Sequence, residues 1–163
     1  MTDTQTSEQR HANMAAIHGK DTKPEMVVRR WLWRHGYRYR LNHPRLPGRP
    51  DIVMRKYKTC IFVNGCFWYG HEGCRFYTIP KTNREFWVEK VERNRERDLR
   101  VRNKLTMMGW RCITIWECEL KPKLREKTLE SLAYTLNKMY LKDYGAKLYE
   151  IPDQEQLLAA ETE

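Results

Sequence analysis

A short stretch of the chain, residues 64–74, carries most of its metal-binding side chains. Cys66, His71 and Cys74 stand at C-x4-H-x2-C spacing, and a further candidate, Cys118, lies far down the chain. Three Cys and one His form a set typical of structural Zn²⁺, and such a closed tetrahedral set leaves no position for a reacting water. We therefore interpret the predicted zinc as a structural metal that ties chain segments together. The alternative is a pair of buried thiols with a loop histidine, and spacing alone leaves Cys118 open.

Two carboxylates indicate a second kind of chemistry. Asp51 opens an apolar segment directly after a Pro-Gly-Arg-Pro loop. A carboxylate at the start of a buried strand is costly unless it has a partner, so we interpret Asp51 as a metal ligand, with a turn residue as the alternative. Glu25 can complete a capping box with Thr22 or help to hold a metal ion. Mg²⁺ needs few carboxylates and can activate water for attack on a phosphodiester, so the pair indicates nuclease chemistry.

The elements that must position these residues follow from caps and hydrophobic periodicity. Residues 22–36 predict a helix that carries Glu25, with Thr22 as its N-cap and Gly36 at its end. Residues 37–41, 52–54, 60–63 and 111–117 are predicted strands, and the second and third form a hairpin that carries Asp51. A long helix is predicted from a capping box at residues 82–85 to about residue 108. A C-terminal amphipathic helix is marked by Leu129, Leu132, Ala133, Leu136, Met139 and Tyr140.

Most charges of residues 94–102 are interpreted as a solvated helix face, and Cys60 and Cys112 as thiols of the core. The chain has 163 residues, enough for one domain, with residues 21–145 as its folded part. Residues 1–20 are predicted to be an arm that orders on binding, although a frayed terminus is the alternative, and residues 146–163 an acidic tail.

Composition narrows the class of partner and the compartment. A net charge of +10, from 31 basic against 21 acidic residues, favours a polyanion such as nucleic acid. No apolar run is long enough to span a membrane, and the polar N-terminus does not resemble a secretory signal. The 5 Cys are an odd number, which favours reduced thiols and a cytoplasmic location.

Several longer motifs extend this interpretation. They are Pro47-Gly48-Arg49-Pro50-Asp51, Ile61–Trp68, Glu85-Phe86-Trp87, Asn94 with Arg97-Asp98, Gly109-Trp110-Arg111 and Trp116-Glu117-Cys118. Together they resemble the very short patch repair endonucleases, which nick DNA beside a T·G mismatch left by deamination of 5-methylcytosine. The resemblance covers roughly residues 10–140.

The resemblance implies an α/β, restriction-endonuclease-like fold, a mixed β-sheet flanked by helices, with a structural zinc site. It implies that Asp51 and the main-chain carbonyl of Val63 bind Mg²⁺, and that Glu25 holds metal-bound water. The zinc ligands that it implies are Cys66, His71, Cys74 and Cys118.

The resemblance also implies how DNA is bound. Phe67, Trp68 and Trp87 would form an aromatic wedge that enters the duplex beside the mismatch, where unstacking a step costs a few kcal/mol. Core packing is the alternative for these rings, most of all for Trp87. The arm with Met14 would clamp the DNA, and Lys90 and Asn94 would contact the mismatched pair. The implied partners are double-stranded DNA with a T·G mismatch and mismatch-repair proteins, and we expect a monomer because a single nick needs one active site.

Two positions depart from the family, which usually carries His where this chain has Asn64 and Tyr69. The second His is thought to be the general base, and tyrosine, with a pKa near 10, is a poor one. A positioned base is typically worth about 10²- to 10⁴-fold, so we expect slower cleavage, not its loss. Asn64 could donate a hydrogen bond to a phosphate, and His43 could substitute as a base if its loop folds over the site.

Three functions are therefore compatible with the sequence. The first is an active Mg²⁺-dependent DNA-nicking endonuclease. The second is a zinc-stapled mismatch-binding protein with weak or no cleavage, and the third a restriction-type endonuclease of the same fold. The presence of both Glu25 and Asp51 favours the first.

Overall fold

The structure is a computed structural model that describes residues 6–15 and 19–145. Its helices are α1 (Ser7–Ala15), α2 (Lys23–Arg34), α3 (Arg84–Met107) and α4 (Arg125–Asp143), with short 3₁₀ turns η1 (Arg55–Tyr57) and η2 (Glu117–Leu120). Its strands are β1 (Arg40–Leu41), β2 (Ile52–Met54), β3 (Thr59–Asn64) and β4 (Arg111–Trp116). The predicted arm and tail lie partly or wholly outside the described residues, since 1–5, 16–18 and 146–163 are not among them.

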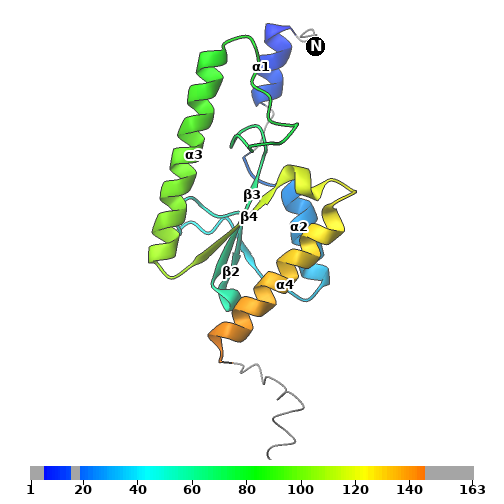
Figure 1. Ribbon diagram of the computed structural model, residues 1–163, viewed down its shortest axis with the longest axis vertical. Coiled ribbons are helices and arrows are strands. Elements are labelled where there is room, and N and C mark those ends of the chain that lie inside the picture. The colour runs from blue at the N-terminus through cyan, green and yellow to red at the C-terminus, as the bar shows by residue number, and fades with distance from the viewer. Residues whose placement is uncertain (1–5, 16–18, 146–163) are drawn as a thin grey trace, which may run out of the picture.

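The strands form a sheet in the order β1-β2-β3-β4. The first three are antiparallel, and β4 runs parallel to β3, with α3 as the crossover between them. Figure 1 shows α3 on one side of the sheet and α2 and α4 on the other. The predicted mixed sheet flanked by helices is thus confirmed. Asn64 at the end of β3 pairs with Trp116 at the end of β4, so the loops that follow both strands leave the same end of the sheet.

Alternation along β3 and β4 divides the core into two clusters. Ile61 and Ile115 face α2 and α4, where Leu32, Leu129 and other apolar side chains are fully buried. Cys60, Phe62 and Cys112 face the other side, toward Leu105 of α3, so the Cys60 thiol lies in the core as predicted and the partly buried Cys112 packs against it. Each fully buried Leu or Ile side chain contributes roughly 1.5–3 kcal/mol of transfer free energy. The site therefore stands on a sheet that is packed on both faces.

Helix and strand ends differ in part from the predictions. Thr22 Oγ1 caps α2 by accepting a hydrogen bond from the Glu25 N–H at 3.4 Å, but the Glu25 carboxylate accepts from the Asp21 N–H and not from Thr22. The capping box predicted at residues 82–85 is wrong, because Asn83 takes a left-handed conformation and makes no side-chain cap. The strand predicted over residues 37–41 is shorter, since only Arg40–Leu41 pairs with β2.

None of the described helices is long and apolar enough to cross a membrane.

Candidate functional site

Asp51 lies just before β2, and its side chain reaches β3. Its Oδ2 accepts a hydrogen bond from the Val63 N–H at 2.8 Å. Since Ile52 pairs with Ile61, continuing the antiparallel register places Pro50 opposite Val63. Proline has no N–H to donate, and the N–H and C=O of one residue in such a ladder face the same neighbouring strand. The Val63 carbonyl therefore points toward the chain segment that leads into β2, where Pro50 cannot donate a hydrogen bond to it. Asp51 and Val63 together offer a carboxylate and a carbonyl oxygen.

The environment of Asp51 favours a cation. The pKa of Asp51 is raised to about 6, chiefly by burial and in part by the nearby Glu25 carboxylate, whereas the hydrogen bond from Val63 opposes the shift. The negative charge of a half-buried carboxylate beside another carboxylate is poorly compensated by the protein alone. A divalent ion with oxygen preference would supply the missing positive charge.

Glu25 stands near Asp51 on the first turn of α2 and is 2% exposed. Its Oε2 accepts hydrogen bonds from the Asp21 N–H and from Arg29 Nη2, both at 3.0 Å. Arg29 also donates to Asp21 Oδ1 at 2.6 Å. Burial raises the pKa of Glu25, and these donors oppose the shift. Glu25 is thus both a helix-start residue and a carboxylate fixed toward the site, so the two predicted interpretations are compatible.

The two departures from the family pattern both lie next to this pair. Asn64 follows Val63 at the end of β3, is 3% exposed, and its Nδ2 has no hydrogen-bond partner among the described residues. Tyr69 is half-buried; burial raises its pKa, the Asp98 and Asp51 carboxylates add to the shift, and a hydrogen bond with Arg97 opposes it. A phenol with a raised pKa is protonated at neutral pH, so Tyr69 can donate a hydrogen bond but is a poor base.

The four predicted zinc ligands meet at the end of the sheet. One ligand atom from each of Cys66, His71, Cys74 and Cys118 lies within 4.8 Å of the others. Cys118 Sγ and His71 Nδ1 are 3.4 Å apart, and the His71 ring stacks on Trp116 at 4.1 Å between centroids. With Zn–S bonds of about 2.3 Å, a tetrahedral site has ligand atoms about 3.8 Å apart, so small side-chain movements would close this set. The donors therefore fit a structural zinc.

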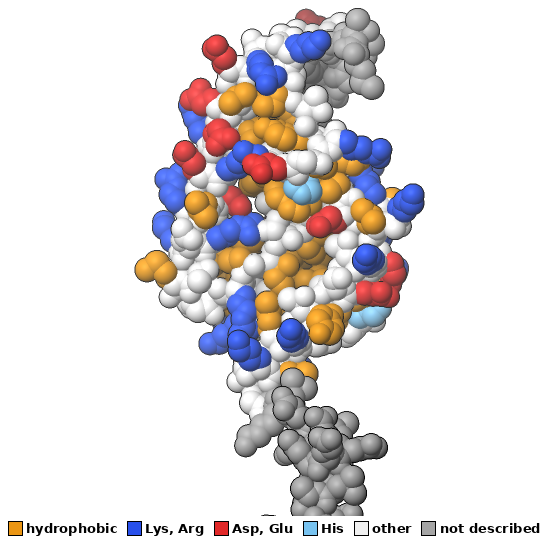
Figure 2. Space-filling model, in the orientation of Figure 1, with side chains coloured by type: hydrophobic (Ala, Val, Ile, Leu, Met, Phe, Trp, Pro, Cys, Tyr) orange, Lys and Arg blue, Asp and Glu red, His pale blue; other side chains and the backbone are white. Residues whose placement is uncertain are grey.

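The predicted wedge residues form one aromatic cluster. Phe67, Trp68 and Trp87 meet edge to face, with ring centroids 5.3, 5.4 and 6.0 Å apart. All three are half-buried, so they belong to neither the closed core nor the free surface. Figure 2 shows hydrophobic side chains gathered between the N-terminal helix and the sheet, with both acidic and basic side chains around them.

The chain has clear relatives among known proteins. A family model described as DNA mismatch endonuclease Vsr matches residues 2–75. A type II nicking enzyme of Neisseria meningitidis serogroup A is 50% identical over 123 residues, which cover 76% of this chain and 87% of that protein. A type II nicking enzyme of Xanthomonas oryzae is 45% identical over 74% of this chain and 88% of its own length. The DNA mismatch endonuclease Vsr of Escherichia coli is 40% identical over 79% and 83%.

The chain belongs to the Vsr family of DNA endonucleases. The resemblance found in the sequence is therefore confirmed, and so is the prediction of a DNA-nicking enzyme. Both carboxylates, Cys66, His71 and Cys74 lie within the residues 2–75 that the family model matches.

Most of the predicted site residues meet at one end of the sheet. Asp51, Val63, Asn64, Tyr69 and Glu25 surround one end of the sheet, with the Cys/His cluster beside them. The other predicted DNA contacts are more scattered. Met14 is 40% exposed on α1, Lys90 is exposed on α3, and Asn94 is buried, with its amide donating to the Trp68 carbonyl at 2.9 Å. His43 accepts a hydrogen bond from the Arg45 N–H within its own loop.

Sequence reasoning missed several residues that hold the site. Arg29 stands four residues after Glu25, a spacing at which opposite charges pair on a helix, so this signal was available. Arg95 and Asp98 fell within the run assigned to a solvated face, yet both are half-buried. Residues 92–98 of α3 contain no apolar side chain, and this was the usable signal, because a helix face that is buried there must pack on polar groups.

Proposed function

We propose that this Vsr-family endonuclease nicks one strand of double-stranded DNA beside a T·G mismatch in an Mg²⁺-dependent reaction. The observation that carries the proposal is the contact between Asp51 and the Val63 main chain, with Glu25 and Tyr69 beside it. The printed names of the family model and of the E. coli relative support the mismatch. The family match and the mixed sheet flanked by helices support a restriction-endonuclease-like fold.

Asp51 and the Val63 carbonyl would hold Mg²⁺, which polarises a phosphate and lowers the pKa of a bound water. The fit rests on a carboxyl with a pKa of about 6 beside a carbonyl that lacks a ladder donor. Glu25, fixed by Arg29, would orient water at the same place. Asp51 would thus hold the metal ion and Glu25 would orient the water, so neither carboxylate has to be a strong base.

Tyr69 and Asn64 would act on the phosphate side. Tyr69 is protonated and can donate a hydrogen bond to a phosphate oxygen or to the attacking water. The Asn64 Nδ2, which has no partner among the described residues, can donate another. Because neither side chain titrates near neutral pH, their contribution is orientation and charge stabilisation. We expect a slower enzyme than one with His at position 69.

The Cys66, His71, Cys74 and Cys118 cluster would hold Zn²⁺ as a structural metal. Its donor set has no open position, and it ties the loop after β3 to the turn after β4. The zinc would therefore keep Tyr69 and the aromatic cluster at the end of the sheet and take no part in bond breaking.

Phe67, Trp68 and Trp87 would form the wedge that opens the duplex at the mismatch. Three half-buried aromatic rings in mutual contact make a rigid apolar surface that can replace lost base stacking. Met14 on the arm of residues 1–20 would clamp the duplex, and Lys90 and Asn94 would contact the mismatched pair. Asn94 must first release the Trp68 carbonyl to do so. The domain of residues 21–145 would act as a monomer, followed by a tail of residues 146–163, and mismatch-repair proteins would be its partners.

A nicking assay tests this proposal. A labelled duplex with one T·G mismatch is compared with the same duplex carrying C·G, in Mg²⁺ and without divalent metal. Mismatch-dependent and Mg²⁺-dependent nicking of the T strand is the expected result. Tight mismatch binding without a cut would point to a binding protein, and equal cutting of both duplexes would point to a restriction-type enzyme.

A further inference from the structure

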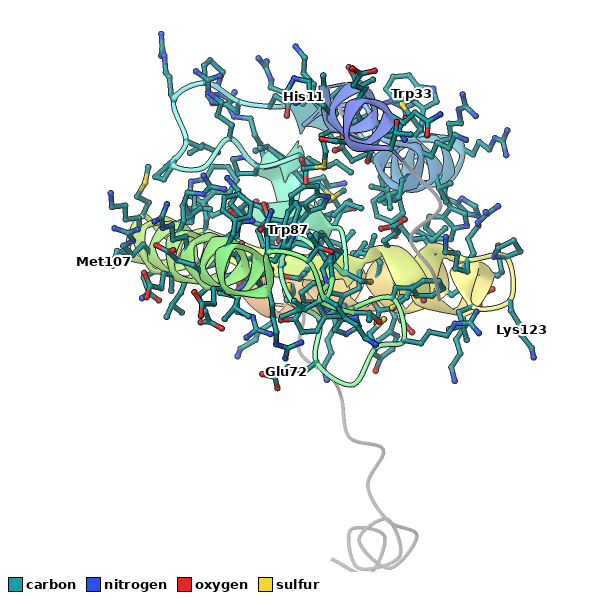
Figure 3. The ribbon with its side chains drawn as sticks, turned by 90° about the horizontal axis from the view of Figure 1, so that it is seen from above. His11, Trp33, Glu72, Trp87, Met107 and Lys123 are labelled. Carbon is teal, nitrogen blue, oxygen red and sulfur yellow. The ribbon has the colours of Figure 1, made fainter. Side chains whose placement is uncertain are left out.

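Arg95 of α3 joins the helix to the loop that follows β3. Its Nε donates to the Tyr69 carbonyl at 3.2 Å, and its Nη2 donates to the next carbonyl, that of Gly70. Its Nη1 donates to Glu92 at 3.0 Å, and Glu72 lies 3.8 Å from Nη2. Every nitrogen of the guanidinium is thus engaged within the protein. Figure 3 shows Glu72 at the outer rim of this loop.

The Tyr69 and Gly70 carbonyls, to which Arg95 donates, lie between the Asp51 centre and the Cys/His cluster. The Tyr69 side chain is within electrostatic reach of Asp51 and Asp98, whereas His71, two residues on, belongs to the Cys/His cluster. On its other side the Tyr69 N–H donates to the Gly65 carbonyl at 3.3 Å. The backbone of Tyr69 is therefore fixed from within the loop on one side and by Arg95 on the other.

Gly70 shows that this approach of loop and helix is close. Its φ is +58°, and a Cβ there would lie 2.5 Å from Arg95 Nη2 and 2.7 Å from Val91 Cγ1. A side chain at position 70 would thus push the loop away from α3. The main chain of the loop therefore packs directly against α3.

Arg95 differs from a solvent-facing arginine of the same helix. Arg93, two residues earlier, has a 70% exposed side chain and a simple ion pair with Glu89. The Arg95 side chain is 30% exposed, and its donors are already used by carbonyls and carboxylates. A guanidinium so occupied has little left to offer a phosphate, so its contribution lies within the protein.

We propose that Arg95 is a positioning residue for DNA nicking, which holds Tyr69 at the Asp51 centre independently of the Cys/His cluster. The inference rests on the role proposed for Tyr69. Arginine suits this task because its planar fork can serve two adjacent carbonyls at once, whereas lysine has a single point of attachment. Arg95→Lys should therefore retain part of the function, and Arg95→Leu very little.

The test compares Arg95→Leu, Arg95→Lys and, as a control on the same helix, Arg93→Leu in the full chain. Single-turnover nicking at saturating enzyme is measured on the duplex that the wild type cuts, together with the DNA Kd, bound zinc and thermal unfolding. We expect Arg95→Leu to slow nicking about 10- to 100-fold, as misplacement of a reacting group does, with bound zinc and DNA Kd nearly unchanged. Arg95→Lys should lie between this variant and the wild type, and Arg93→Leu should nick at the wild-type rate.

A second arm shows whether Arg95 acts through Tyr69. In a Tyr69→Phe background, Arg95→Leu should slow nicking little further, because residues that act as one unit are not additive. Full additivity, loss of bound zinc, or an unchanged rate in Arg95→Leu would overturn the proposal. Failure of mismatch selectivity is read separately, from the wild type on T·G and C·G duplexes, so it is not confused with failure of this inference.

Discussion

Replacing Asp51 by Asn should abolish nicking and, without Mg²⁺, make the protein more stable. Asp51 has its pKa raised from 3.8 to about 6, chiefly by burial. The folded state therefore prefers the protonated carboxyl. Its contribution to stability is present below about pH 4 and is lost as the pH rises through about 6. At pH 8 the charged carboxylate is a cost, and Asn removes it while its amide oxygen can still accept the hydrogen bond from Val63.

The size of the effect follows from the shift. One pKa unit corresponds to about 1.4 kcal/mol, so a shift of roughly 2 units amounts to about 3 kcal/mol at most. Because the Asp51 side chain keeps some contact with solvent, we expect Asp51→Asn to raise the free energy of unfolding by about 1–3 kcal/mol at pH 8. The difference between variant and wild type should shrink toward zero near pH 4.

Urea unfolding of both proteins at pH 4, 6 and 8 measures this difference, in buffer without Mg²⁺ and without a chelator that would remove a metal from the Cys/His cluster. Acid can also release a metal from that cluster, but it does so in both proteins, so only the difference between them is used. Added Mg²⁺ should then stabilise the wild type and not the variant.

Asp143→Asn is the matched control. A hydrogen bond from Arg111 lowers the pKa of Asp143, so that carboxylate stabilises the protein above its ordinary pKa and its removal should not raise stability at pH 8. If Asp51→Asn is no more stable than the wild type at pH 8, or if the difference does not fall with pH, the burial of an uncompensated carboxylate is not the reason for the Asp51 environment.

Three further predictions concern the other parts of the site. Tyr69→His should raise the single-turnover nicking rate about 10-fold or more at pH 7.5, because imidazole can accept a proton near neutral pH; a lower rate would show that the hydrogen bond from the phenol matters more than a base at this position. Cys118→Ser should lower bound zinc, measured by a colorimetric release assay, and lower the melting temperature by several degrees, whereas Cys112→Ser should leave bound zinc unchanged. Trp68→Ala should weaken binding to a T·G duplex more than to a C·G duplex in a fluorescence titration, by a factor of about 10, and equal weakening would count against a wedge.

Local signals were enough for much of the fold. The caps at Thr22 and Gly36, the apolar runs at 52–54 and 60–63 and the period of the C-terminal helix predicted elements close to those observed, because each depends on neighbours a few residues apart. The same local reasoning was wrong for the start of α3. There Asn83 adopts a left-handed conformation, and the following helix begins without the expected side-chain cap.

The sequence by itself determined the chemistry of this protein: the side-chain types, the spacing of Cys66, His71 and Cys74, and the acidic residue after the Pro-Gly-Arg-Pro loop. Only the tertiary structure decided which distant groups meet. The parallel pairing of Asn64 with Trp116 brings Cys118 beside Cys66, since each Cys lies two residues past its strand. The antiparallel pairing of β2 and β3 gives Asp51 the Val63 main chain, and the crossover helix places Arg95 against the loop. These contacts depend on sheet register and on how a helix packs across many residues, and no local pattern encodes them.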